Sequence, residues 1–179
     1  MSTKQILLSG FGGQGILFSG KMIAYKGLIE DKQVSWLPSY GPEMRGGTAN
    51  CSVIISDTPV GSPIVSNPDI LVAMNLPSMD RFEESVVSGG MIFYDSSLVE
   101  RSVKREDVKV YPVPATRLAG ENGFPTLANM ILVGKILKEL GEFDEEVIMT
   151  TLKKIISAKR VDMIDVNMKA LRLGAEYCE

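Results

Sequence analysis

The chain contains no histidine, and its 179 residues include only two cysteines, Cys51 and Cys178. Zinc sites and catalytic triads that depend on imidazole are therefore excluded. An iron–sulfur cluster normally takes four thiolates, so this chain cannot hold one by itself. Two cysteines also give no disulfide framework, and Cys51, which stands in an apolar strand pattern, is expected to be a buried small hydrophobic residue.

Long apolar runs and a strong charge bias are also missing. No segment approaches the roughly 20 consecutive apolar residues of a transmembrane helix, and the N-terminus does not resemble a signal peptide, so we expect a cytoplasmic protein without a membrane contact. The 19 basic and 22 acidic residues give a formal net charge of −3. This charge gives no general attraction to nucleic acid. The basic pairs Lys153-Lys154 and Lys159-Arg160 are expected to form a solvated helix face.

A short apolar run near the N-terminus ends in four glycines, Gly10, Gly12, Gly13 and Gly15. Glycine lets the backbone turn sharply and approach a ligand, and a helix that begins at Ile16 would aim its unpaired N–H groups at an anion. The spacing also fits the dinucleotide fingerprint. In that fingerprint the first glycine forms the turn, the second admits the ligand and the third packs the helix against the strand.

One element of the dinucleotide fingerprint is missing from this sequence. The fingerprint requires an acidic residue at the end of the second strand to hold a ribose hydroxyl. Here the strand expected over 33–37 ends in Trp36-Leu37, and the acids Glu30 and Asp31 lie before it. Ordinary NAD or FAD binding is thereby disfavoured, and two explanations of the turn stay open: a site for a phosphate or coenzyme A type anion, and a purely structural turn.

The remaining pattern alternates strands with helices. Strands are expected over 48–55, 70–74, 91–94 and 108–113, with a short returning strand at 60–62 on a sheet edge. Helices are expected after Ile16 and Pro77, over 127–140 and 144–157, and from Asp162 or Asp165 onwards. Gly20 and Gly27 indicate that the first helix lies close against the sheet. Residues 1–179 are thus predicted to form one α/β domain: a doubly wound, mostly parallel, Rossmann-like sheet with an antiparallel edge insertion and a helical C-terminal end.

Ligands of such sheets bind outside the carboxyl ends of the strands, which groups the glycine turn, the loop over 39–47, Asn75 and Asp95. Arg45 can grip a phosphate or carboxylate, although it can equally cap a carbonyl or contact a partner protein. Tyr40, Met44 and Trp36 in an exposed loop favour an interface. The stretch 122–129 fits either a functional loop or a turn before a capped helix. No catalytic or metal-binding residue is predicted, and the predicted cofactor-binding residues are Gly10, Phe11, Gly12, Gly13, Gln14, Gly15, Ser39, Tyr40, Gly41, Met44, Arg45, Gly46, Gly47 and Asn75.

Two motifs in this order carry a family resemblance. The sequences GFGGQGI at 10–16 and SYGPEMRGGTAN at 39–50 together resemble the gamma subunit of the 2-oxoacid:ferredoxin oxidoreductases. The C-terminal pattern of Asn167, Ala170 and Gly174 is similar to that family too. The resemblance spans essentially the whole chain and favours the 2-oxoglutarate type.

The resemblance implies an enzyme of several chains that decarboxylates a 2-oxoacid, passes the acyl group to coenzyme A and reduces ferredoxin. Thiamine diphosphate and magnesium are then expected between the alpha and beta subunits, and iron–sulfur clusters in partner chains, with a delta subunit among them. This chain would serve assembly, close the site and bind coenzyme A through the glycine turn and Arg45. When isolated it is expected to form a homodimer. The alternatives are a stand-alone nucleotide-binding module and a purely structural interaction subunit.

Overall fold

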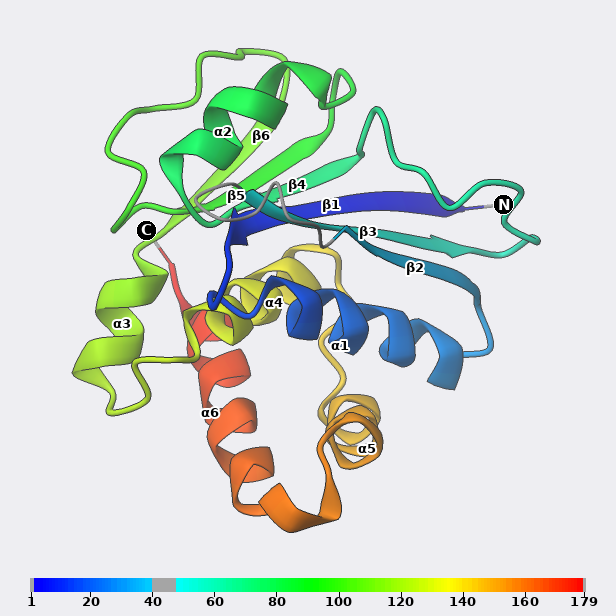
Figure 1. Ribbon diagram of the computed structural model, residues 1–179, viewed down its shortest axis with the longest axis vertical. Helices are drawn as coiled ribbons and strands as arrows, with labels where there is room; N and C mark the ends of the chain where they lie inside the picture. Colours follow the sequence, from blue (N-terminus) through cyan, green and yellow to red (C-terminus); the bar gives the residue numbers. More distant parts are fainter. Residues whose placement is uncertain (1, 40–47, 179) are drawn as a thin grey trace.

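The computed structural model describes residues 2–39 and 48–178 and shows one six-stranded sheet (Figure 1). Its strands lie side by side in the order β2-β3-β1-β4-β5-β6. β1, β4, β5 and β6 run parallel, whereas β3 pairs antiparallel with both β1 and β2. The strand bounds are β1 Thr3–Phe11, β2 Gln33–Ser39, β3 Thr48–Ser56, β4 Ile70–Ala73, β5 Met91–Asp95 and β6 Lys109–Val113.

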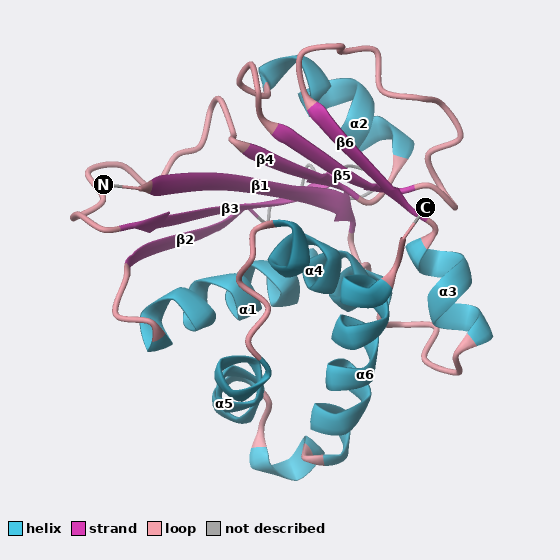
Figure 2. Cartoon of the chain, turned by 180° about the vertical axis from the view of Figure 1, so that it is seen from behind, coloured by secondary structure: helices cyan, strands magenta, loops and turns pink. Residues whose placement is uncertain are grey.

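Helices cover both faces of this sheet, as the prediction of a doubly wound α/β fold requires (Figures 1 and 2). α2 lies on one face, and α1 and α4 lie on the other, with α5 and α6 packed behind them. The helix bounds are α1 Ile16–Ile29, α2 Leu76–Phe82, α3 Ala115–Glu121, α4 Ala128–Glu139, α5 Glu145–Ile155 and α6 Asp162–Glu176, and the short 3-10 turns are η2 Glu83–Ser85 and η3 Ala158–Arg160.

The antiparallel insertion is confirmed, but its predicted returning strand is wrong. Residues 60–62 form no strand and belong to an irregular connection between β3 and β4. Pro59 and Pro63 flank this segment, and proline has no N–H with which to extend a sheet. The antiparallel edge consists of β2 and β3 instead.

The sheet separates two apolar cores, and α4 lies at the centre of the larger one. Its residues from Ala128 to Gly134 are all buried, because the sheet covers one side of the helix and α6 the other. The smaller core lies under α2, around Met79, Leu71 and Ile92, none of which is exposed. The predicted helix after Pro77 therefore does cover a second face.

α1 lies close against the sheet, as its two small residues indicated. A Cβ on Gly20 would collide with the sulfur of Cys51 in β3, and a Cβ on Gly27 would lie 3.0 Å from Val34 in β2. Cys51 is fully buried, as predicted, and its sulfur accepts a 2.9 Å hydrogen bond from Trp36 Nε1. Trp36 is exposed, as predicted, at 38%, but it belongs to strand β2 and not to a loop.

The two thiols are expected to react at very different rates. Burial raises the pKa of the Cys51 thiol to about 11, so only about one molecule in a thousand carries the reactive thiolate at pH 8. Cys178 is exposed. Titration of the native chain with a disulfide reagent at pH 8 should release one equivalent rapidly and the second only after unfolding in guanidinium. Two rapid equivalents from the native chain would contradict this burial of Cys51.

Candidate functional site: the glycine turn

The turn between β1 and α1 is built from glycines with three different roles. Gly12 has open space around its Cα, whereas Gly13 and Gly15 adopt φ angles of 95° and 76° that favour glycine. A Cβ on Gly10, which lies within β1, would come 2.7 Å from both Gln14 and Ile16. Gly10 therefore allows close packing and does not form the turn, contrary to its role in the dinucleotide fingerprint.

Gly15 also departs from that fingerprint. It is the N-cap of α1 in the left-handed conformation, and a Cβ there would come 2.5 Å from the amide of Asn129 in α4. The missing side chain at this third glycine thus allows helix α4 to come close, whereas in the fingerprint it allows the helix to pack against the strand. Asn129 donates from Nδ2 to the Gly15 carbonyl oxygen at 3.2 Å, which fixes the start of α1.

Gln14 ties the turn to the carboxyl end of β4. Its side-chain Oε1 accepts from the Phe11 backbone N–H at 2.6 Å and from Asn75 Nδ2 at 3.4 Å, and its Nε2 donates to the Met74 carbonyl oxygen at 3.1 Å. The predicted grouping of the glycine turn with Asn75 is therefore correct. Both amide atoms of Gln14 are used within the protein, which makes this side chain an anchor of the turn.

Asn75 has an internal task as well. It is 2% exposed, and its Oδ1 accepts from the Ser78 backbone N–H at 2.9 Å, which caps α2. Ser9 Oγ donates to Ser78 Oγ or Asn50 Oδ1, at 2.8 and 2.7 Å respectively. This buried polar network joins the ends of β1, β3 and β4 beneath the turn. Sequence reasoning missed Ser9 and Ser78, although a serine inside an otherwise apolar strand is a usable signal of such a network.

A hollow of about 270 Å³ opens above the turn. α1 begins there without a side-chain cap and without an acidic residue in its first turn. The first N–H groups of a helix have no intrahelical partner and carry the positive end of its dipole, so the start of α1 favours an anionic group, whereas the walls of the hollow are mostly apolar. Its lining residues are Phe11, Gly12, Gly13, Gly15, Ile16, Leu17, Phe18 and Ala49.

The second predicted site segment lies largely outside the described residues. Ser39 is the last residue of β2 and pairs with Asn50 across the ladder, and Thr48 pairs with Phe11, at the edge of the glycine turn. Both ends of the segment thus flank the turn. The residues Tyr40, Gly41, Met44, Arg45, Gly46 and Gly47 fall within 40–47 and outside the described ranges.

Two further charged positions differ from expectation. Asp95 is fully buried and accepts from the backbone N–H groups of Ser97 and Thr116, so its carboxylate holds the start of α3. Lys159 and Arg160 lie in the 3-10 turn η3, and Arg160 lines a pocket. Both residues are exposed, as predicted, but they lie in a 3-10 turn and not on the face of an α-helix, because a charge pattern alone does not show where a helix ends.

Neither a metal site nor a membrane span is found in the described ranges. Residues 2–39 and 48–178 contain no group of three His, Cys, Asp or Glu side chains placed to hold a metal ion. No helix in these ranges has both the length and the apolar character to cross a bilayer.

Two curated relatives match most of the chain. It is 41% identical over 175 residues to the ketoisovalerate oxidoreductase subunit VorA of Methanothermobacter marburgensis, covering 97% of this chain and 36% of that protein. The chain therefore spans about a third of the length of VorA. It is 38% identical over 138 residues to the 2-oxoglutarate synthase subunit KorC of Methanocaldococcus jannaschii, covering 75% of this chain and 74% of KorC.

Solved structures share the whole architecture. The gamma subunit of a keto/oxoacid ferredoxin oxidoreductase from Geobacter sulfurreducens superposes with a TM-score of 0.82 at 27% identity, covering 97% of this chain and 96% of that one. A 2-oxoglutarate:ferredoxin oxidoreductase from Magnetococcus marinus, with 2-oxoglutarate, coenzyme A and succinyl-CoA bound, has the same fold. Its TM-score is 0.86 at 23% identity, covering 100% of this chain and 32% of that one.

Fold and turn together define a doubly wound α/β domain that presents an uncapped helix N-terminus at the carboxyl edge of its sheet. The family model of the pyruvate ferredoxin/flavodoxin oxidoreductases matches residues 5–177. The chain belongs to this family, as a chain of the gamma-subunit type.

Proposed function

We propose that the chain is the gamma subunit of a heteromeric 2-oxoacid:ferredoxin oxidoreductase and that its glycine turn binds a phosphate of coenzyme A. The reaction converts a 2-oxoacid and coenzyme A into acyl-CoA and carbon dioxide, releases one proton and passes two electrons to ferredoxin. The observation that carries the role of this chain is the turn: among residues 2–39 and 48–178, Gly12 leaves room for a ligand beside the uncapped start of α1.

The other cofactors belong to partner chains in this proposal. Thiamine diphosphate, bound with magnesium between alpha and beta subunits, supplies the electron sink for decarboxylation. Iron–sulfur clusters in partner chains, with a delta subunit among them, carry the electrons. With no histidine and two cysteines in the whole chain, the gamma subunit itself contributes assembly, closure and backbone N–H groups.

The proposed 2-oxoacid is 2-oxoglutarate, which the 2-oxoglutarate synthase relatives support. Ketoisovalerate is the second candidate. The ketoisovalerate oxidoreductase relative supports it, with 41% identity to this chain against 38% for the 2-oxoglutarate synthase relative. Purification of the tagged chain from its host, followed by coenzyme A-dependent reduction of a viologen dye, tests both acids. Recovery of larger partner chains with this activity is expected, whereas a chain that comes down alone and binds NAD would support the nucleotide-binding alternative.

Substitution of Gly12 by valine should weaken coenzyme A binding in the assembled enzyme. Within residues 2–39 and 48–178, a Cβ at this position meets no atom within 4 Å beyond its chain neighbours, so folding of this part should be unaffected while the hollow is filled. We expect the KM for coenzyme A to rise about tenfold, the loss of one charge-assisted hydrogen bond. Steady-state kinetics over a coenzyme A series measure this change.

Gly61→Val is the matched control, because Gly61 also has open surroundings but lies in the connection between β3 and β4. It should leave the KM unchanged. If Gly12→Val also leaves the KM unchanged in the intact complex, the turn does not bind coenzyme A. If it prevents assembly, the turn contacts a partner chain and the purely structural alternative is favoured.

A further inference from the structure

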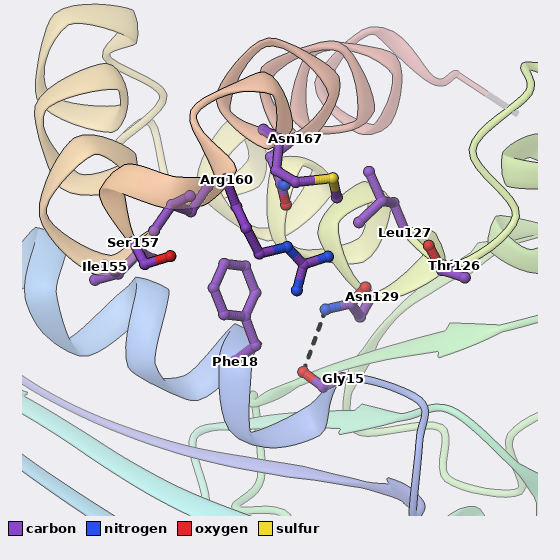
Figure 3. A pocket seen from close by; sticks show the side chains of 11 residues that line it. Gly15, Phe18, Thr126, Leu127, Asn129, Ile155, Ser157, Arg160 and Asn167 are labelled. Atoms are coloured by element: carbon purple, nitrogen blue, oxygen red, sulfur yellow. Dashed lines mark hydrogen bonds between the residues drawn. The ribbon is translucent and has the colours of Figure 1, made fainter.

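A second pocket lies beside the glycine turn, between the starts of α1 and α4 and the turn η3 that leads into α6 (Figure 3). Its volume of about 370 Å³ is in the range of small-molecule sites. It shares Gly15 and Phe18 with the hollow above the turn. Its lining includes the side chains of Phe18, Leu127, Asn129, Arg160, Met163 and Asn167.

Two buried amide oxygens in this pocket lack a hydrogen-bond donor. Asn129 is 4% exposed and Asn167 is 2% exposed, and the Oδ1 atom of each has no partner in the described part of the chain. Asn129 Nδ2 donates to the Gly15 carbonyl oxygen, and Asn167 Nδ2 donates to the Met163 carbonyl oxygen at 2.7 Å. Asn129 Nδ2 also donates to Ser19 Oγ at 3.0 Å. Turning either amide over would set its oxygen against a backbone carbonyl oxygen, of Gly15 or of Met163. Both oxygens are therefore unpaired acceptors at the wall of the pocket, each almost fully covered by its neighbours.

Arg160, an exposed residue of η3, supplies a cation to the wall of the same pocket. Figure 3 shows its guanidinium reaching inward, between Asn129 and Asn167 and near the ring of Phe18. Within residues 2–39 and 48–178 this guanidinium has no carboxylate partner, and none of the lining residues is acidic. A planar cation of this kind selects phosphate or carboxylate.

We propose that this pocket binds a nucleoside phosphate whose base carries an exocyclic amine. The base would pack on Phe18 between the apolar walls of Leu127 and Met163, its amine would donate to the free amide oxygens, and its phosphate would pair with Arg160. Inorganic phosphate alone leaves the apolar walls of Phe18, Leu127 and Met163 without a partner. The nucleotide has two possible sources: a free mononucleotide such as AMP, or the nucleotide end of coenzyme A, and the second source rests on the function proposed above.

Calorimetric titration of the full chain with AMP tests the pocket. AMP is expected to bind, and Arg160→Gln should weaken its Kd at least about tenfold, since the charge-assisted bond to the phosphate is lost. Lys159→Gln is the matched control, because Lys159 is the adjacent exposed cation and does not line the pocket. It should leave the Kd unchanged. Inosine monophosphate carries an oxygen in place of the amine and should bind about tenfold more weakly than AMP.

Three results would overturn the proposal: no AMP binding at millimolar concentration, an Arg160→Gln chain that binds AMP like the wild type, or inorganic phosphate that binds as tightly as AMP. Competition with coenzyme A then separates the two sources. Displacement of AMP assigns the pocket to the nucleotide end of coenzyme A, and retention of AMP assigns it to a free nucleotide. A normal KM for coenzyme A in the Gly12→Val enzyme would refute coenzyme A binding by the glycine turn. It would not change the expected effect of Arg160→Gln on AMP binding, so the two proposals can fail separately.

Discussion

Replacement of Gly174 by alanine should destabilise the protein by about 3 kcal/mol or more, and Gly134→Ala should do the same. The two glycines lie where α4 crosses α6. A Cβ on Gly174 would come 2.7 Å from the carbonyl carbon of Ile131, and a Cβ on Gly134 equally close to the carbonyl carbon of Leu171, with the carbonyl oxygens closer still. Backbone cannot move aside as a flexible side chain can, so one methyl group must force the helices apart.

Urea unfolding followed by circular dichroism measures this loss. Gly120→Ala is the matched control, since Gly120 is also helical, in α3, and its new methyl group would meet no described atom within 4 Å beyond its own helical backbone. It should stabilise the protein by up to about 1 kcal/mol, the difference in helix propensity. A Gly174→Ala chain as stable as the Gly120→Ala chain would show that the crossing of α4 and α6 has room to spare.

The second large effect is expected at the buried ammonium group of Lys26. This α1 side chain is 2% exposed, and its Nζ lies 2.7 Å from Glu30 and 3.7 Å from Glu142, which also pairs with Lys4. The double substitution Glu30→Gln with Glu142→Gln leaves the buried cation without a carboxylate and should cost about 3 kcal/mol. Lys26→Met keeps the volume and removes the charge, so its stability should be equal to or above that of the wild type.

An exposed pair on α3 provides the comparison. Arg117 and Glu121 have the same spacing along a helix as Lys26 and Glu30, but both are more than half exposed. Glu121→Gln should change the free energy of unfolding by less than about 0.5 kcal/mol, as is usual for exposed pairs. Equal losses in the double variant and in Glu121→Gln would mean that water reaches Lys26 as freely as it reaches Arg117.

The order of strands and helices was readable from the sequence, whereas the strand pairing was not. Apolar runs such as 70–74 and caps such as Asp144 are local signals, and the structure places an element at each. The position of β3 between β1 and β2 depends on pairs far apart in the chain, such as Thr3 with Ser56. No local pattern reports such a pair. α3 was missed as a separate helix because Asp95, distant in sequence, holds its first turn.

The candidate site was predictable where it depends on glycine. The turn at 10–15 and its closeness to Asn75 followed from residue type and from the rule on strand ends. The hydrogen bonds of Gln14 within the protein and the unpaired oxygens of Asn129 and Asn167 could not be predicted. The sequence of a helix is the same whether the amide of its asparagine is hydrogen-bonded or not. The stretch 122–129 forms a turn and the start of α4, but Leu127 at the N-cap makes no side-chain cap bond.

The central place of β3 has a consequence for the emerging polypeptide. β1 and β2 are both complete by Ser39, yet they are never neighbours, since one strand separates them. Two strands with a third between them lie about 9–10 Å apart, so β1 and β2 share no hydrogen bonds of the native sheet. Residues 3–39 thus leave the ribosome before the native partner that both strands share. The sheet can begin to form only when residues 48–56 arrive and pair with both at once.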